Sequence, residues 1–162
     1  MSHQSAIRWQ CSHFDQLSTL ELLRILQARS AVFVLEQHCV YQDIDHKDPH
    51  CHHLMAWDEQ QRLAAYLRIV PAGISFEEPS LGRVLTTQAH RGSGIGKELI
   101  VRGIRELHQL YPDAAIRIGA QQYLEKFYAS FGFETVSAMY LEDDIPHIDM
   151  LRPAEARIPE AV

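Results

Sequence analysis

Residues 81–97 read Leu81-Gly82-Arg83-Val84-Leu85-Thr86-Thr87-Gln88-Ala89-His90-Arg91-Gly92-Ser93-Gly94-Ile95-Gly96-Lys97. The β-prone run at 84–87 predicts a strand, which leads into a turn with three glycines. Glycine adopts backbone conformations that a Cβ forbids, and it lets main-chain N–H groups approach a bound group closely. A helix is predicted next, from the apolar residues Ile95, Leu99, Ile100, Ile104 and Leu107. Because the first turn of a helix has unpaired N–H groups and a favourable dipole, this stretch predicts a cradle for a phosphate or pyrophosphate.

The spacing of the glycines decides which phosphate-binding motif is present. Gly92-Ser93-Gly94-Ile95-Gly96 reads G-x-G-x-G, and Lys97 follows it. A dinucleotide fold needs G-x-G-x-x-G, and a P-loop needs G-x-x-x-x-G-K followed by Ser or Thr, so both motifs are excluded. The pattern that does match is R-G-x-G-I-G directly after a strand.

That pattern resembles the acetyl-CoA loop of the GNAT N-acetyltransferases. The segment at 127–133, Phe-Tyr-Ala-Ser-Phe-Gly-Phe, is similar to a second motif of the same family. Further stretches narrow the resemblance to the ElaA-like branch of small bacterial GNAT proteins: residues 32–37, Cys39, Tyr41, Asp45-x-x-Asp48, His53-Leu54, Gln121 and residues 140–150. The matches follow the family's order and cover roughly Val32 to Met150, which makes the resemblance specific.

The resemblance implies a mixed α/β fold, with a mostly antiparallel central sheet that contains a parallel, splayed strand pair and is flanked by helices. It implies acetyl-CoA as cosubstrate and direct attack by a primary amine through a tetrahedral intermediate. The main chain at Leu85 and Thr86 would pair with the pantetheine arm and place an N–H donor near the thioester carbonyl. The loop that would hold the CoA pyrophosphate consists of Arg91, Gly92, Ser93, Gly94, Ile95, Gly96 and Lys97.

Tyr128 has two interpretations. Its spacing places it on an apolar helix face with Leu124 and Phe131, which is typical of a packed core tyrosine. The resemblance instead matches it to the family's tyrosine that lies beside the CoA sulfur and protonates the leaving thiolate. A phenol stays protonated at neutral pH and can donate there. We favour the catalytic interpretation, in which Tyr128 also contacts the cofactor.

An amine acceptor must lose a proton before it can attack, because an ammonium has no lone pair. The candidate proton acceptors are Glu36, Glu142, Asp143 and His147. A histidine titrates in the useful range, whereas a carboxylate can act through water or simply attract a cationic substrate. For each acidic residue the alternative is a solvated surface carboxylate. Gln121, at the end of its strand, could orient the acceptor, and the identity of the base stays open among these groups.

Length and composition limit the remaining possibilities. A chain of 162 residues with 46% hydrophobic residues predicts one domain at 1–152 and a loosely ordered tail at 153–162. The formal charge of −6 argues against nucleic acid as a partner, and no apolar run approaches membrane-spanning length. Three cysteines without C-x-x-C spacing predict a reducing cytoplasm and free thiols, and the resemblance implies a bacterial protein. The acceptor stays open between a small-molecule amine and a protein amine, and a homodimer stays open as well.

Local patterns predict the order of the elements. A capping box at 18–21 predicts a helix over about residues 19–33. Residues 62–70 alternate, so one face of that strand is expected in the core and the other partly in water. Residues 115–119 are expected to form a strand parallel to that at 84–87, because a helix connects them. The other expected elements are strands at 7–10, 53–57, 133–136, 139–141 and 147–151 and a helix at 122–131.

Two features complicate this interpretation. A group of potential metal ligands lies close together, namely His46, His50, Cys51, His52 and His53. Their spacing matches no standard zinc pattern, so we predict no metal there and expect a solvated loop, with His53 held by Asp45 or Asp48. In addition, Asp144 stands where the ElaA-like branch usually has glycine. Aspartate tolerates a left-handed turn better than most residues, so the turn is expected to survive with an added charge.

Three functions therefore compete. The first is an acetyl-CoA-dependent N-acetyltransferase. The second is a non-catalytic acyl-CoA-binding sensor or interaction module on the same fold, because a fold does not fix a function. Binding of CoA without turnover would favour it. The third is a metal-binding protein built on residues 46–53, which metal analysis of untagged protein would test.

Overall fold

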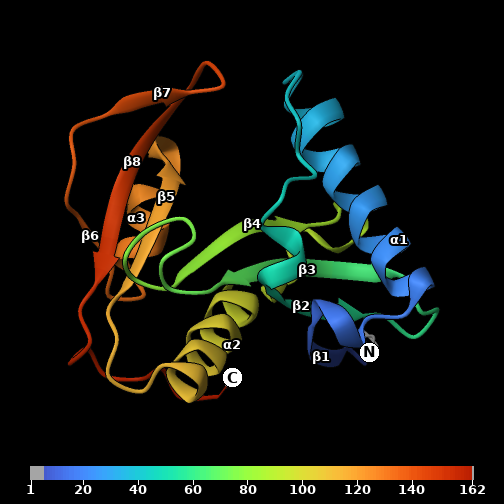
Figure 1. Ribbon diagram of the computed structural model, residues 1–162. Helices are drawn as coiled ribbons and strands as arrows, with labels where there is room; N and C mark the ends of the chain where they lie inside the picture. Colours follow the sequence, from blue (N-terminus) through green and yellow to red (C-terminus); the bar gives the residue numbers. More distant parts are fainter. Residues whose placement is uncertain (1–5, 162) are drawn as a thin grey trace. The chain divides into compact units, whose positions relative to one another are not determined.

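The structure, a computed structural model, describes residues 6–161. Contacts between residues group them into two units, and Figure 1 shows the elements of both. The first unit contains residues 6–68 and 83–99, and the second contains residues 69–82 and 100–161. The division passes through three elements: β3 (Leu63–Val70), β4 (Ser80–Thr86) and α2 (Ile95–Leu110).

A four-stranded sheet with the order β1-β2-β3-β4 runs through the first unit. Its edge strand β1 (Arg8–His13) pairs antiparallel with β2 (His52–Trp57). The turn between β2 and β3 is closed by Asp58, whose carboxylate accepts from the main-chain N–H groups of Gln60 and Arg62 at 2.9 Å each. The two strands predicted at 53–57 and 62–70 are therefore present and joined by a turn, although each begins one residue away from its expected position.

Helix α1 (Thr19–Arg29) begins at the predicted capping box. The Ser18 hydroxyl accepts from the N–H of Glu21 at 3.0 Å, and the Glu21 carboxylate accepts from the N–H of Ser18 at 2.8 Å. The helix does not end near residue 33, because it widens into the π-helix η2 (Ser30–Glu36). Segments of this kind are rare and often occur at functional sites.

The core of the first unit lies where α1 and η2 meet the strands. Ile25 and Phe33 pack there against side chains from the sheet: Met55, Trp57, Leu63, Tyr66 and Leu85. Three short 3-10 helices lie in the connections of this unit: η1 (Phe14–Gln16), η3 (Asp48–His50) and η4 (Gln88–His90).

The prediction for β3 is wrong in one respect. All eight of its residues are buried, although the alternation predicted that one face would be partly in water. The polar residues of that face are Tyr66 and Arg68, and both have buried partners. The phenol of Tyr66 bonds His53, and Arg68 forms ion pairs with Asp45 and Asp48. Polar side chains in this strand therefore mark a buried polar layer.

The second unit is built around β8 (Ile145–Arg152), and Figure 1 shows β8 between β5 and β7. β5 (Ile116–Gln121), β6 (Glu134–Thr135) and β7 (Tyr140–Glu142) all pair antiparallel with it. The expected helix at 122–131 is shorter than predicted. It consists of η5 (Gln122–Leu124) and α3 (Glu125–Ala129).

The strands on either side of α2 belong to different sheets, with β4 in the first and β5 in the second. No ladder between β4 and β5 is found among residues 6–161. The predicted apolar positions of α2 are all buried: Ile95, Leu99, Ile100, Ile104 and Leu107. The chain is thus a mixed α/β protein with antiparallel sheets flanked by helices, as the sequence indicates.

Two residues after β8, Arg157 and Pro159, accept hydrogen bonds from arginines elsewhere in the second unit. Arg105 donates to the carbonyl of Pro159 at 3.0 Å, and the buried Arg152 donates to the carbonyls of Phe131 and Arg157. None of the three cysteines forms a disulfide bond within residues 6–161. Between residues 6 and 161, no helix combines the length and the apolar character that crossing a membrane requires.

Candidate functional site

Two of the three glycines in the turn between β4 and α2 have a conformation that favours glycine. Gly92 and Gly94 have φ angles of 81° and 83°, in the left-handed region that favours glycine. Gly96 has no such constraint, because a Cβ there would lie 3.6 Å from Cγ2 of Thr86, which is an ordinary contact. The N–H of Glu98 makes the first bond of the helix, to Gly94 at 3.4 Å. The N–H groups of residues 95–97 therefore have no partner within the helix and can bind an anion.

The residues before this turn are anchored to the β2–β3 hairpin. Thr87 donates from its main-chain N–H and its hydroxyl to the carbonyl of Ala64, at 3.0 and 3.2 Å. The ring of His90 lies 3.0 Å from the Thr87 hydroxyl and 3.3 Å from the buried carboxylate of Asp58. Ser93 closes the turn by donating to the carbonyl of His90 at 2.7 Å. The hairpin thus fixes the start of the glycine turn.

Arg91 connects the turn to β4 and to η2. Its Nε donates to the carbonyl of Thr86 at 3.2 Å, and its terminal nitrogen lies 2.7 Å from the Glu36 carboxylate. The two side chains are 42% and 37% exposed. Exposed ion pairs contribute at most about 1 kcal/mol, so the Arg91 guanidinium can exchange this carboxylate for a phosphate at little cost.

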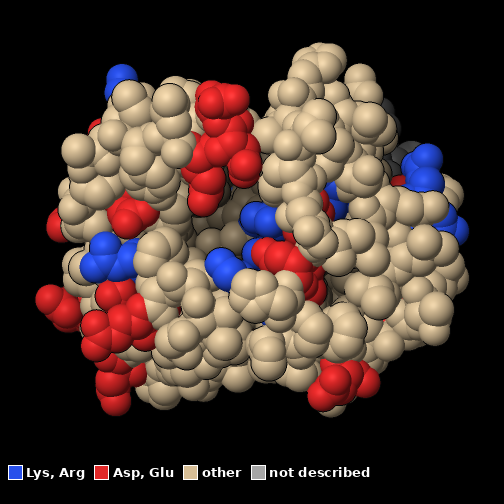
Figure 2. All heavy atoms as spheres, turned by 45° about the horizontal axis from the view of Figure 1, so that its top comes forward, with Lys and Arg blue, Asp and Glu red and all other residues tan. Residues whose placement is uncertain are grey.

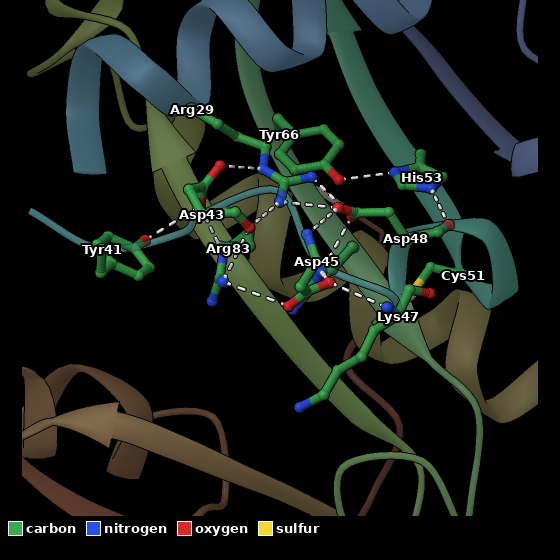
Figure 3. Close-up of polar contacts among 11 residues, drawn as sticks. Arg29, Tyr41, Asp43, Asp45, Lys47, Asp48, Cys51, His53, Tyr66 and Arg83 are labelled. Carbon is green, nitrogen blue, oxygen red and sulfur yellow. Dashed lines mark hydrogen bonds and ion pairs between the residues drawn. The ribbon is translucent and has the colours of Figure 1, made fainter. Parts of the chain in front are cut away.

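A buried network of three arginines and three aspartates joins α1, β3 and β4 to the loop that follows η2 (Figure 3). Arg29 on α1 is fully buried, and it lies 2.9 Å from the carboxylate of Asp43 and 2.7 Å from that of Asp48. Arg68 on β3 lies 2.7 Å from Asp45 and 2.9 Å from Asp48. Burial would raise the pKa of Asp48, but the hydrogen bonds and charges of the two arginines outweigh burial and lower it.

Arg83 completes this network from β4. Its Nε lies 2.7 Å from a carboxylate oxygen of Asp43, and it donates from a terminal nitrogen to the main-chain carbonyl of the same residue at 3.1 Å. Its φ of 51° is rare for a residue with a side chain. The strained residue lies two positions before Leu85, which is buried in the core of the first unit.

His53 is held inside the same network (Figure 3). Its Nε2 lies 3.1 Å from the main-chain carbonyl of Asp48, which can only accept, so Nε2 carries the hydrogen. Its Nδ1 lies 2.7 Å from the phenol of Tyr66 and accepts from it. Burial lowers the pKa of His53 to about 4, so the ring is neutral at pH 7. The expected contact between His53 and Asp48 is therefore made by the main-chain carbonyl of Asp48 and not by its carboxylate.

The other potential metal ligands of this region do not converge. His52 makes an edge contact with the ring of His13, at 5.1 Å between centroids. The thiol of Cys51 donates to the carbonyl of Lys47 at 3.2 Å, and burial raises its pKa to about 11. In the described part of the chain, no group of three or more His, Cys, Asp or Glu residues could hold a metal ion.

In the second unit, His147 on β8 has a defined tautomer. Its Nδ1 lies 2.7 Å from the carbonyl of Ile145, which can only accept, so Nδ1 carries the hydrogen. The neutral ring therefore has its lone pair on Nε2, which lies 3.4 Å from the carboxylate of Glu142. The ring can accept a proton at Nε2, and the resulting imidazolium is paired with that carboxylate. In the strand register, His147 lies opposite Tyr140 on β7 and Gln121 on β5.

The turn between β7 and β8 survives without its usual glycine. Asp143 and Asp144 have φ angles of 49° and 62°, and they connect the paired residues Glu142 and Ile145. Two successive positive φ values define a type I′ turn, which aspartate enters more readily than most residues. The three acidic side chains at 142–144 are exposed, and Figure 2 shows acidic side chains gathered over the end of this hairpin.

Tyr128 lies on α3 with only 6% of its surface exposed. Its ring makes edge contacts with Phe127 and Phe133, at centroid distances of 5.2 and 6.0 Å. Burial raises the pKa of the phenol, so it stays protonated at neutral pH. No hydrogen bond of the phenol oxygen is found within residues 6–161.

Several predicted site residues lie together within each unit. In the first unit, Glu36 contacts Arg91, and Arg91 contacts the main chain of Thr86. In the second unit, four further predicted residues lie at one end of β8 or on the chain segments next to it there: Gln121, Glu142, Asp143 and His147. The ring of Tyr140 lies against His147, and the sequence alone does not indicate it as a site residue. The two-residue turn at 143–144 could have revealed it, since that turn fixes which residues of β7 and β8 face each other.

Comparisons with known proteins agree with these features. Residues 19–152 match the acetyltransferase (GNAT) domain family. Over 148 residues the chain is 41% identical to Protein ElaA of Escherichia coli, covering 90% of this chain and 96% of that protein. The crystal structure of an acyl-CoA N-acyltransferase from Pseudomonas aeruginosa has a TM-score of 0.87 at 40% identity, over 91% of this chain and 99% of that one. That of Escherichia coli ElaA has a TM-score of 0.85 at 40% identity. The chain therefore belongs to the ElaA-like branch of the GNAT acetyltransferase family.

Proposed function

We propose that the protein is an acetyl-CoA-dependent N-acetyltransferase that acts on a primary amine. The observation that carries the proposal is the turn at 91–97, in which Gly92 and Gly94 adopt left-handed conformations directly before the N-terminus of α2. Such a turn, placed after a strand, binds phosphate groups through main-chain N–H donors. Membership of the GNAT family makes CoA the phosphate ligand that fits it.

The residues present fit CoA in charge as well as in backbone shape. Arg91 and Lys97 add two cations to the N–H donors of residues 95–97. Arg91 needs only to exchange the carboxylate of Glu36 for a phosphate oxygen, and a guanidinium binds phosphate well. The main chain at Leu85 and Thr86 would hold the pantetheine arm. Acetyl-CoA supplies the acetyl group as a thioester, which is activated for transfer to nitrogen.

His147 is our choice for the base that takes the proton from the ammonium of the acceptor. Its Nδ1 hydrogen is held by a main-chain carbonyl, so Nε2 is the basic atom. The Glu142 carboxylate at 3.4 Å from Nε2 would stabilise the imidazolium that forms. Gln121 and Asp143 lie beside this group in sequence or register and would contact the acceptor.

Tyr128 would supply the proton that the leaving thiolate needs. Its phenol stays protonated, since burial raises its pKa, and it has no partner for its hydrogen within the described residues. Glu36 was one of the candidates for the general base, but its contact suits a different role. Because its carboxylate contacts Arg91 at 2.7 Å, it would hold that arginine in place until CoA binds.

The test is a calorimetric titration with acetyl-CoA, followed by a screen of primary amines in which release of free CoA thiol is measured. We expect binding of acetyl-CoA and turnover with at least one amine. Turnover should rise with pH through the neutral range, and His147→Ala should reduce it without changing the affinity for acetyl-CoA. A protein that fails to bind acetyl-CoA would refute the proposal. Binding without turnover on any amine would favour the non-catalytic sensor.

A further inference from the structure

Tyr140 on β7 and His147 on β8 face each other across the hairpin. Their rings are stacked, with centroids 6.0 Å apart and planes 24° apart. The phenol of Tyr140 reaches two residues further along β8 and donates to the carboxylate of Asp149 at 2.7 Å. Because side chains alternate along a strand, residues 147 and 149 lie on the same face of β8. One tyrosine therefore contacts both.

The neighbouring strand leaves room for this arrangement. Gly119 on β5 lies opposite Asp149. A Cβ added to Gly119 would lie 3.2 Å from the phenol oxygen of Tyr140 and 3.9 Å from the Asp149 carboxylate. A contact of 3.2 Å is tighter than most real Cβ contacts, so a side chain at 119 would push the tyrosine away. The other side of Asp149 is fixed too, because its N–H donates to the hydroxyl of Ser137 at 2.8 Å.

We propose that Tyr140, Asp149 and Gly119 form a positioning device for the imidazole of His147. The inference rests on the proposed function, in which His147 is the base. Asp149 holds the phenol, the phenol holds the Tyr140 ring, and the ring supports one face of the imidazole. The Ile145 carbonyl then holds Nδ1–H, so Nε2 keeps its lone pair and a fixed direction.

The charges around His147 are consistent with this role. The titratable groups that contact it are the Glu142 carboxylate, at 3.4 Å from Nε2, and the Tyr140 phenol of the stacked ring. Gln121, opposite it on β5, is uncharged. Burial and the bond to Asp149 raise the pKa of the Tyr140 phenol, so this group stays neutral and does not compete for the proton. The negative charge of Asp149 is used to hold the phenol.

Four variants separate positioning from simple packing. Tyr140→Phe keeps the stacked ring but loses the bond to Asp149, whereas Tyr140→Leu loses both. Asp149→Asn keeps an oxygen that can accept from the phenol, whereas Asp149→Ala does not. Tyr111→Phe, at the end of α2, is the matched control for loss of a phenol hydroxyl elsewhere in the second unit.

Two measurements are made on each variant. The first is kcat on an amine that the wild-type protein acetylates. We expect Tyr140→Phe and Asp149→Ala to lose about tenfold and Tyr140→Leu about a hundredfold, since a general base contributes ~10²-fold or more. Asp149→Asn and Tyr111→Phe should stay near wild type, and KM for acetyl-CoA should change in none of them. The pH at half-maximal kcat should shift in Tyr140→Leu alone.

The second measurement is the ¹⁵N spectrum of the His147 ring, assigned by comparison with His147→Gln. The wild type should show the Nδ1–H tautomer, and Tyr140→Leu should show a mixture of both tautomers. This measurement needs no substrate. It therefore tests whether Tyr140 positions the imidazole even if no amine is acetylated and the proposed function fails. An unchanged ¹⁵N spectrum in Tyr140→Leu would overturn the inference by itself, and so would wild-type kcat in both Tyr140 variants.

Discussion

Removal of the Arg29 guanidinium should destabilise the fold more than most single substitutions. The side chain is fully buried and donates four hydrogen bonds, all to Asp43 and Asp48, at 2.7 to 3.1 Å. In Arg29→Ala the network would keep three carboxylates but only two arginines, so one buried negative charge would lack compensation. Breaking a buried pair in this way costs about 3–5 kcal/mol.

The assay is urea unfolding followed by fluorescence and circular dichroism, with agreement of the two probes as the test for a two-state transition. A loss of this size is a large share of the ~5–15 kcal/mol that holds a domain of ordinary stability. It corresponds to a fall in Tm of roughly 6–20 °C, at about 2–4 °C per kcal/mol for a chain of this size. A second substitution, Asp48→Asn, removes a negative charge from the same network. The double variant should therefore be more stable than the sum of the two single losses predicts.

The chain offers a matched control in Arg157, which also lies 2.7 Å from a carboxylate, that of Glu160. That pair is exposed, with side chains 85% and 82% accessible. Arg157→Ala should change stability by less than about 0.5 kcal/mol. If Arg29→Ala lowers the free energy of unfolding no more than Arg157→Ala does, then burial does not determine how much these ion pairs contribute to stability, and the prediction is wrong.

Four further predictions concern single positions. Gly94→Val should abolish acetyl-CoA binding in calorimetry because its φ of 83° suits only glycine, whereas Gly96→Ala, whose Cβ meets Thr86 at an ordinary distance, should retain it. Equal loss in both would show that backbone conformation is not the reason. Tyr128→Phe should lower turnover by ~10²-fold with unchanged acetyl-CoA affinity, and wild-type turnover would make it a packing residue. Asp144→Gly should stabilise the protein by about 0.5–1 kcal/mol, since it relieves a φ of 62°, and a lower Tm would contradict this. Because burial lowers the pKa of His53 from 6.5 to about 4, the unfolded chain binds a proton first as pH falls. Between these two values the free energy of unfolding should drop by up to about 3 kcal/mol, and His53→Gln should lack that slope.

The features that the sequence predicts well are those set by neighbouring residues. The capping box depends only on Ser18 and Glu21, which are three residues apart. The glycine turn and the apolar face of α2 are likewise local, because a helix repeats every few residues. The family resemblance allows predictions beyond these local features, since it rests on the order of several motifs along the chain, which no local rule gives.

The features that the sequence does not reveal depend on partners far apart in the chain. Arg29 contacts residues 14 and 19 positions away, and Arg91 contacts Glu36 across 55 positions. No periodicity links such residues. The alternating pattern that contains Arg68 therefore predicted a strand face partly exposed to water, whereas Arg68 is buried among carboxylates. The stack of Tyr140 on His147 lies between these two cases, because its residues are neither neighbours nor far apart in the chain. It follows from the register of one hairpin, but only after the turn at 143–144 is known.

The buried network also connects the stability of the first unit with its proposed binding site. Its three carboxylates all come from the short segment 43–48, whereas its arginines come from three elements, α1, β3 and β4. Arg83 adopts a strained φ of 51° in β4, and such strain persists only where the surroundings hold the residue firmly. Asp43 does so through both its carboxylate and its carbonyl. Since Leu85 and Thr86 follow within three residues, the same contacts fix the segment proposed to bind the pantetheine arm.

A hydrophobic core of equal volume could be as stable as this network. However, it would lack the directional bonds that hold β4 in its irregular path, so we interpret the cluster as a device for backbone geometry first and for stability second.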